Sequence, residues 1–179
     1  MEKEPKVFTI DAMSLDDIEA ATHMRLESWL DTYVNNDFGV THEWIEARNQ
    51  EQLSSERMER RRERFDNAKT AAWVAKDSRG EVIGVTSPYV DENGTQHVGS
   101  LYVDKEYHGS GIAGQLMQRA IEWFDASKPI ELGVVAYNER AKAFYRKWGF
   151  MEIPNSEVLF ADKIPEVKMI RKGDTQDEV

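Results

Sequence analysis

The chain has 179 residues, which is the size of one ordinary domain. Hydrophobic residues make up 40% of the sequence and charged residues 31%, so a packed core is expected and a disordered chain or a collagen-like repeat is excluded. The formal net charge of −10 repels phosphate backbones, which argues against nucleic acid as the main partner.

The beginning of the chain has no apolar stretch after its basic residues, so no secretion signal is expected. No window approaches the 18 or more apolar residues of a membrane span, and a cytoplasmic protein is expected. The chain has no cysteine, so disulfides and thiolate nucleophiles are excluded. No pair among the four histidines has the HxH or HxxxH spacing of a zinc site, so no metal is expected.

A short β-prone run at residues 6–10 precedes two predicted helices. The first helix starts at a Ser-Leu-Asp-Asp run (residues 14–17) that resembles a capping box, and it extends to about Tyr33. The second is predicted from Glu43 to about Asn67. Its arginine-rich run at residues 56–64 could dock an acidic partner, but the interleaved glutamates largely cancel its field and favour a solvated helix face.

From Ala71 onward the sequence predicts strands and two further helices, with an Asn-Gly turn signal at residues 93–94. Strands are expected at residues 71–75, 82–86, 97–103, 130–136, 157–160 and 166–170, and helices at 111–126 and 138–148. Asn138 is the expected N-cap of the last helix, and Gly149 follows its end. No repeat or linker interrupts the pattern, so residues 1–172 are expected to form one domain and residues 173–179 a polar tail.

A strand, a short turn, a glycine-rich loop and a helix follow one another over residues 101–114. Glycines let the backbone approach a ligand closely, and the N–H groups of a helix start bind phosphate oxygens. Residues 109–114 also match the GxGxxG pattern of an NAD-linked oxidoreductase. That fold places its first glycine directly after the strand, with several βαβ units to follow. Here five residues separate Val103 from Gly109 and only 65 residues follow Gly114. The sequence around the motif therefore does not fit a dinucleotide-binding fold.

The same loop resembles the acetyl-CoA-binding motif of the GCN5-related N-acetyltransferase (GNAT) superfamily. The pattern of Gln or Arg, two residues, Gly, one residue, then Gly or Ala maps onto residues 108–113, with His108 in place of Gln or Arg. A second run, NERAKAFYRKWGF at residues 138–150, resembles the family's downstream signature. The two motifs stand in the family's order, 24 residues apart from Gly114 to Asn138. The resemblance covers roughly residues 71–171, and the first seventy residues fit it only in outline.

The resemblance implies an α/β (α+β) acyl-CoA N-acyltransferase fold, with a mixed, largely antiparallel splayed sheet of six to seven strands and about four helices. The strands ending at Val103 and Ala136 would separate, and pantetheine would lie between them along the backbone of Leu101 and Val103. The Leu101 N–H would polarise the thioester carbonyl. The residues expected to bind acetyl-CoA are Leu101, Tyr102, Val103, His108, Gly109, Ser110, Gly111, Ile112, Ala113, Gly114, Asn138, Ala141 and Phe144.

Tyr145 is the catalytic side chain that the resemblance implies, because a hydroxyl that donates to the departing sulfur speeds its loss. The alternative is a core tyrosine without chemistry. His97 is a candidate general base, since some relatives carry a glutamate at this position, four residues before the Leu-Tyr-Val start, and an imidazole pKa of about 6.5 suits proton uptake. A half-buried strand histidine without chemistry, Glu27, Tyr33 and a chain of waters remain alternatives.

The implied function is transfer of the acetyl group of acetyl-CoA to a primary amine of a small molecule or peptide, by direct attack in a ternary complex. The negative net charge slightly favours cationic acceptors such as polyamines. Trp29, Tyr33, Phe38 and Trp44 either wall the acceptor site or belong to the core. A non-catalytic acetyl-CoA-binding sensor or assembly module is the alternative, and the presence of Tyr145 favours the enzyme. The sequence leaves open the acceptor, the use of other acyl groups, and whether the chain forms a homodimer.

Overall fold

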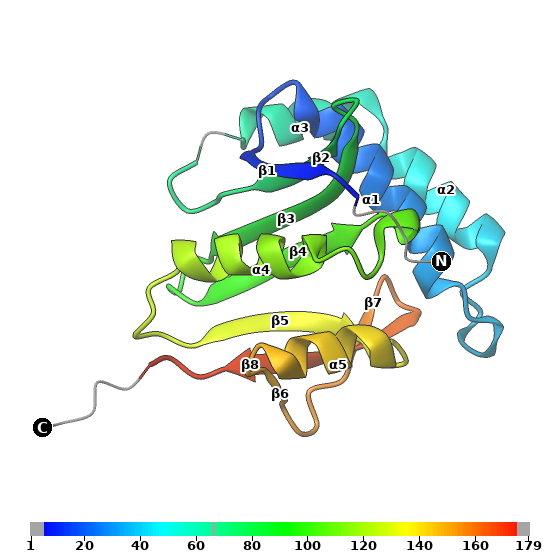
Figure 1. Ribbon diagram of the computed structural model, residues 1–179. Helices are drawn as coiled ribbons and strands as arrows, with labels where there is room; N and C mark the ends of the chain where they lie inside the picture. Colours follow the sequence, from blue (N-terminus) through cyan, green and yellow to red (C-terminus); the bar gives the residue numbers. More distant parts are fainter. Residues whose placement is uncertain (1–5, 66, 175–179) are drawn as a thin grey trace, which may run out of the picture.

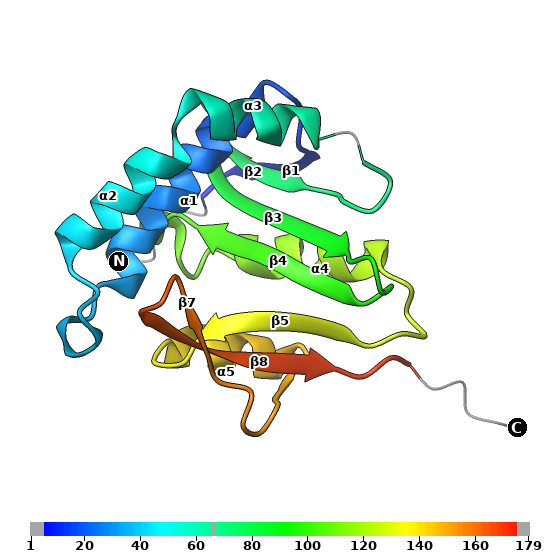
Figure 2. The same ribbon diagram turned by 180° about the vertical axis from the view of Figure 1, so that it is seen from behind.

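The computed structural model describes residues 6–65 and 67–174. One eight-stranded sheet has the order β1-β2-β3-β4-β5-β8-β6, and β7 also pairs with β8. Helices α1, α2 and α3 lie on one side of this sheet, and α4 and α5 lie on the other (Figures 1 and 2). The strands are β1 (Phe8–Ala12), β2 (Trp73–Asp77), β3 (Val82–Val90), β4 (Gln96–Val103), β5 (Ile130–Val135), β6 (Met151–Glu152), β7 (Val158–Phe160) and β8 (Ile164–Arg171). The α-helices are α1 (Asp17–Tyr33), α2 (His42–Gln52), α3 (Ser55–Glu63), α4 (Ile112–Trp123) and α5 (Glu139–Lys147), with 3₁₀ turns η1 (Asn36–Phe38) and η2 (Lys105–Tyr107).

The predicted mixed α/β fold is confirmed, with one strand and one helix more than expected. The two-residue strand β6 was not predicted. The single helix predicted over residues 43–67 is wrong, because α2 ends at Leu53, whose N–H bonds the Asn49 carbonyl, and Ser54 turns away from helical geometry. Asp66, the last residue but one of that prediction, lies outside the described residues, as do residues 1–5 and most of the predicted tail at 173–179.

The start of α1 matches the predicted capping box in part. The Asp17 carboxylate accepts hydrogen bonds from the Ser14 backbone N–H at 2.9 Å and from the Ser14 hydroxyl at 2.8 Å. The same carboxylate pairs with Lys76 of β2 at 2.7 Å. These contacts fix the beginning of α1 against the sheet. Within residues 6–65 and 67–174, none of the helices has the length and apolarity that crossing a lipid bilayer would require.

A β-bulge interrupts β4 beside the position where β4 and β5 diverge. Leu101 pairs with Thr86 and Val98 with Pro88, so β4 has one residue more than β3 between these pairs. A Cβ on Gly99 would lie 2.8 Å from the Tyr89 ring, so the bulge leaves no room for a side chain there. Thr86 stabilises the bulge by donating its hydroxyl hydrogen to the Ser100 carbonyl at 3.0 Å.

Strands β4 and β5 run parallel but pair only at their beginnings, through Gln96 with Ile130 and His97 with Glu131. Over the rest of its length β5 pairs with β8 on its other edge. The backbone of β4 therefore has a free edge toward β5 from Val98 to Val103, and the two strands diverge in Figure 1. The predicted splay of the sheet is confirmed.

Asn138 is the N-cap of α5, as predicted, and its Oδ1 accepts the Ala141 N–H at 3.1 Å. Replacing Asn138 by alanine is expected to lower the free energy of unfolding by about 1 kcal/mol, because that N–H loses its partner. Urea denaturation measures the change. Asn138→Asp keeps an acceptor at the cap and is the control; equal losses for the two variants would contradict the capping role.

Candidate active site

A cleft of about 840 Å³ opens where β4 and β5 diverge. The residues predicted to bind acetyl-CoA line it, except Ser110, and so do both predicted catalytic residues, Tyr145 and His97. Of the predicted acceptor walls, Trp29 and Tyr33 line the cleft. Phe38 instead stacks on Tyr137 with ring centroids 5.4 Å apart. The remaining candidates, Trp44 and Glu27, lie outside the set of residues that line this cleft.

The glycine loop forms a cradle at one end of the cleft. Gly109 and Gly111 have φ angles of 82° and 92°, a left-handed conformation that favours glycine. A Cβ built on either residue would meet no atom within 4 Å, so the space beside the loop is open. Gln115 is the first residue of α4 whose N–H bonds within the helix, to the Gly111 carbonyl, which leaves the preceding N–H groups without helical partners. Such a cradle fits a pyrophosphate.

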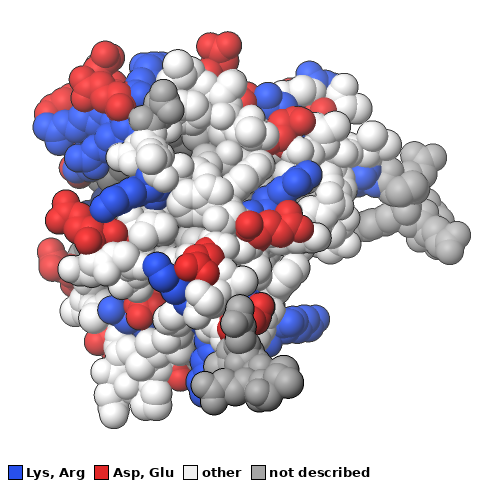
Figure 3. Space-filling model, turned by 90° about the vertical axis from the view of Figure 1, so that its left-hand side faces the viewer, with Lys and Arg blue, Asp and Glu red and all other residues white. Residues whose placement is uncertain are grey.

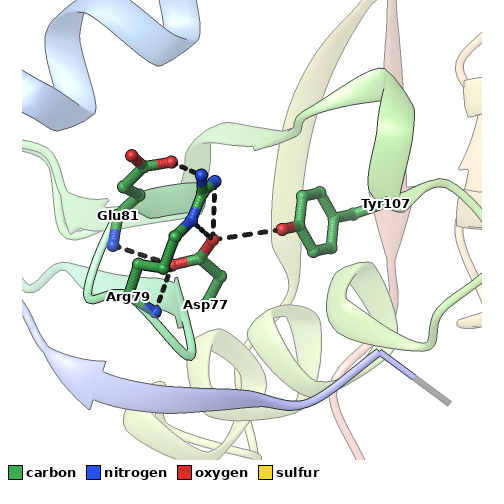
Figure 4. A network of polar contacts seen from close by, with 4 residues as sticks. All are labelled: Asp77, Arg79, Glu81 and Tyr107. Atoms are coloured by element: carbon green, nitrogen blue, oxygen red, sulfur yellow. Dashed lines mark hydrogen bonds and ion pairs between the residues drawn. The ribbon is translucent and has the colours of Figure 1, made fainter.

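The segment that leads into this loop is tied to the turn between β2 and β3. The Tyr107 hydroxyl donates to Asp77 Oδ2 at 3.3 Å, and Arg79 donates to the same oxygen at 3.1 Å (Figure 4). The other oxygen of Asp77 accepts the backbone N–H groups of Arg79 and Glu81. Ser110 lies inside the loop with its Oγ buried and without a partner among the described residues, so its role as a cofactor contact stays a prediction.

His108 connects the loop with β4 and α5. Its Nε2 lies 3.0 Å from the Val103 carbonyl oxygen, and its Nδ1 lies 2.6 Å from the Arg140 guanidinium. A carbonyl only accepts and a guanidinium only donates, so a neutral ring with its proton on Nε2 satisfies both partners. Both ring nitrogens are thus occupied, and Arg140, which sequence reasoning did not identify, brings a cation beside the loop. Lys105 and Lys147 also line the cleft.

Tyr145 lies in the core and also reaches the cleft. Its ring packs against Phe144 and Phe150 at centroid distances of 5.6 and 6.0 Å. Burial raises the pKa of the Tyr145 phenol above its usual value of 10, so the hydroxyl stays protonated at neutral pH. Within the part of the chain that the structure describes, this hydroxyl has no hydrogen-bond partner. It is therefore available to a ligand in the cleft.

His97 lies at the closed end of the diverging strands. Its Nε2 is 3.1 Å from Asp91 Oδ2, and its ring stacks on Tyr89 with centroids 4.8 Å apart. A carboxylate only accepts hydrogen bonds, so Nε2 is the donor in this contact and Nδ1 would be the nitrogen that accepts a proton. Catalysis by His97 stays a prediction. Neither His97 nor any other described His, Asp or Glu belongs to a group of three that could hold a metal ion.

A partly buried carboxylate that sequence reasoning missed faces the same cleft. Glu166 of β8 lines it, and a Cβ on Gly133 of β5 would lie 3.2 Å from Glu166 Oε2, so the missing side chain of Gly133 makes room for the carboxylate. Burial raises the pKa of Glu166. Among residues 6–65 and 67–174 the Glu166 carboxylate has no hydrogen-bond or ion-pair partner. The signal in the sequence was weak: a glycine inside a predicted strand, which often marks a close approach.

Tyr33 and Tyr102 line the cleft on the side of α1, and Tyr137 contacts Tyr33 from outside the lining. The Tyr33 and Tyr102 hydroxyl oxygens lie 3.1 Å apart, and the Tyr137 hydroxyl donates to the Tyr33 carbonyl at 2.7 Å. Burial, followed by the effect of Tyr102, raises the pKa of Tyr33 well above its usual value, so the Tyr33 hydroxyl is polar but uncharged at neutral pH. The hydrogen bond from Tyr137, which immediately precedes the N-cap Asn138, fixes the C-terminal end of α1 near the start of α5.

Sequence comparison and structure comparison both match this chain to acetyltransferases. A family model described as the acetyltransferase (GNAT) family matches residues 38–150. The peptidyl-lysine N-acetyltransferase YjaB of Escherichia coli (strain K12) is 30% identical over 86 residues, 48% of this chain and 53% of that protein, so the match spans about half the length of this curated relative. The PaiA N-acetyltransferase of Thermoplasma acidophilum in complex with coenzyme A has a TM-score of 0.74 at 22% identity, over 93% of this chain and 99% of that one. An acetyltransferase of the GNAT family from Streptococcus pneumoniae has a TM-score of 0.69 at 20% identity, over 94% and 100% of the two chains.

Proposed function

The chain belongs to the GNAT family of acetyltransferases, and from this we propose that it is an acetyl-CoA-dependent N-acetyltransferase acting on a primary amine of a small molecule or peptide. The observation that supports the proposal best is the cleft between β4 and β5. It combines an open glycine cradle, a free strand edge, an unbonded tyrosine hydroxyl and an unpaired carboxylate.

The chain's backbone supplies most of the cofactor contacts in this proposal. Acetyl-CoA, when bound, supplies the acetyl group activated as a thioester. The N–H groups of residues 109–114 hold the pyrophosphate, and the free edge of β4 at Leu101 and Val103 pairs with pantetheine as an added strand would. The Leu101 N–H donates to the acetyl carbonyl oxygen as that oxygen gains negative charge. Asn138 bonds the pantetheine arm from the other wall.

Two side chains handle the protons. An alkylammonium with a pKa of about 10.4 must lose a proton before its nitrogen can attack, and the Glu166 carboxylate accepts that proton. As the C–N bond forms, the nitrogen loses its second proton to solvent, and as the C–S bond breaks, Tyr145 donates its hydroxyl proton to the departing sulfur and is reprotonated from solvent. Glu166 returns its proton to solvent, so each turnover releases one proton. His97 is the other candidate proton acceptor, but its place at the closed end of the sheet, where β4 and β5 still pair, favours Glu166.

Activity is expected to fall as pH falls through the pKa of Glu166, because a protonated carboxylate cannot accept a proton. Burial raises this pKa, so the loss begins at a higher pH than for an exposed glutamate. Glu166→Gln should lower kcat/KM by about 10²-fold above that pKa and abolish this acidic limb. Profiles of kcat/KM against pH measure both effects. His97→Gln is the comparison variant: if it loses the acidic limb and Glu166→Gln keeps it, the proton acceptor is His97.

The alternative is an acetyl-CoA-binding sensor or assembly module without turnover. The free hydroxyl of Tyr145 and the unpaired carboxylate of Glu166 favour an enzyme, because binding alone needs neither. Release of free CoA thiol over a panel of polyamines, amino acids, aminoglycosides and peptides decides between them. The chain has no cysteine, so a thiol reagent reports only CoA. Tight binding of acetyl-CoA, with no free CoA thiol released in the presence of any acceptor, would support the sensor.

A further inference from the structure

A second cavity, of about 700 Å³, adjoins the cleft, and Arg25 of α1 and Ser100 of the β4 bulge line both. Five arginines line it, so we name it the arginine chamber: Arg25, Arg57, Arg60, Arg61 and Arg64. Apolar residues, Met13, Ile18, Phe65, Trp73 and Val85 among them, form other parts of its wall. Lys and Arg side chains gather at the upper left in Figure 3, on the side of the molecule where α3 lies. Four arginines of the run at residues 56–64 thus line this cavity.

The arginines of the chamber differ in their partners. Arg57 pairs with Glu51 at 2.5 Å and Arg60 with Glu56 at 2.6 Å, and all four of these side chains are well exposed. Exposed pairs of this kind are screened by water and exchange partners at little cost. Arg57 and Arg60 therefore each have a carboxylate partner without any ligand.

Arg25 and Arg61 lie deeper and lack such partners. Arg61 donates to the backbone and side-chain oxygens of Gln52, both at 2.7 Å, which are neutral acceptors. The Nε of Arg25 is buried without an acceptor. Among the residues that the structure describes, neither guanidinium pairs with a carboxylate. Burial, and then the nearby charges of Arg25 and Arg57, lower the pKa of Arg61 to about 10. Arg25 and Arg61 are both half-buried, and a bound anion would relieve this concentration of positive charge.

The chamber shares two lining residues, Arg25 and Ser100, with the cleft of the proposed chemistry. Arg25 and Glu166 both line the cleft, so a positive and a negative group face the same cavity, with Arg25 on the side shared with the chamber. A ligand with an amine at Glu166 and an anion at Arg25 would match both charges.

We propose that the arginine chamber binds a carboxylate or phosphate carried by the acceptor, so that the acceptor is an amine with an anionic far end. The inference rests on the proposed acetyltransferase function and narrows its substrate class. Guanidinium groups bind both anions through paired N–H donors. A polyamine would place a second ammonium beside Arg25 and Arg61, where like charges repel. The chamber therefore argues against the polyamine that the net charge suggested.

A matched series of acceptors tests the proposal. Primary amines of increasing chain length are prepared with a methyl, an ammonium, a carboxylate or a phosphate at the far end, and kcat/KM is measured for each. The carboxylate or phosphate form is expected to exceed the methyl and ammonium forms by about tenfold or more, and the ratio of the two anions identifies which is preferred. Preference for the ammonium form, or equal values for all four, would overturn the inference.

Two variants and a control connect the preference with the chamber. Arg61→Gln and Arg25→Gln should each raise KM for the anionic acceptor by about tenfold and leave KM for the methyl form within about twofold. Arg62→Gln is the control, because Arg62 lies on the same helix outside the chamber and faces Glu19 at 3.9 Å. Circular dichroism melts establish that the variants fold. An anion preference that survives in both folded variants would contradict the assignment.

A binding measurement separates this inference from the proposed function. The CoA-bound protein is titrated in a calorimeter with two ligands in turn. One is the N-acetylated amine that carries a carboxylate at its far end, and the other is the N-acetylated amine that carries a phosphate there. Wild-type protein should bind one of them at least about tenfold more tightly than the Arg61→Gln variant. Absence of thiol release with every amine would reject the enzymatic function, whereas turnover without anion binding in the wild type would reject the chamber alone. Binding of neither anion to the wild type overturns the inference whatever the activity.

Discussion

Replacing Tyr145 by phenylalanine is expected to lower kcat for acetyl transfer by about 10²-fold, with the Kd for CoA within about twofold of the wild-type value. The phenol lines the cleft without a hydrogen-bond partner among the described residues, and burial keeps it protonated at neutral pH. Without it, the departing sulfur must take its proton from water. The ring is retained, so its packing against Phe144 and Phe150 persists and the fold should be unaffected.

Steady-state release of CoA thiol measures this effect, and calorimetry measures CoA binding. Tyr89→Phe is the matched control, because Tyr89 also lines the cleft but stacks on His97 at the closed end of the sheet. Its kcat should stay within about twofold of wild type. A Tyr145→Phe enzyme with unchanged kcat would leave Tyr145 as a core residue, the alternative that its burial also supports.

Gly111→Asp is expected to weaken CoA binding by about 10²-fold or more. Gly111 is the N-cap of α4 with φ of 92°, beside open space that the proposal assigns to the pyrophosphate. A carboxylate there repels the phosphates and competes for the N–H groups of the first turn of α4. The left-handed conformation adds strain of about 1 kcal/mol for a residue with a Cβ. Titration calorimetry with CoA measures the affinity.

Two variants separate charge from strain in this experiment. Gly111→Ala introduces the Cβ without the charge and should lose much less affinity than Gly111→Asp. Gly94→Asp introduces the same charge and a similar strain, since Gly94 has φ of 82° and open space around it, but it lies in the turn between β3 and β4. Its CoA affinity should match the wild type. If folded Gly111→Asp protein binds CoA as the wild type does, the phosphate cradle is elsewhere.

Local signals in the sequence predicted most of the elements that build this cleft. The cap at Asn138, the glycines at the start of α4 and the Asn-Gly turn before β4 each depend on neighbouring residues, because caps, left-handed φ angles and tight turns are properties of short segments. The two motifs that resemble the GNAT family lie on these segments, which is why the fold could be predicted. The two-residue strand β6 and the break at Leu53 carry little local signal and were missed.

Contacts between distant residues required the tertiary structure. Glu166 reaches the cleft because β8 pairs with β5 in a register that sets its carboxylate over Gly133, 33 positions earlier in the chain. The pairing of His97 with Asp91 likewise depends on how β3 and β4 align. Arg25 and Arg61 share one chamber only because α1 and α3 pack on the same side of the sheet. Local propensity determines which segments become helices and strands, whereas register and packing decide which charges meet, and no short segment encodes that choice.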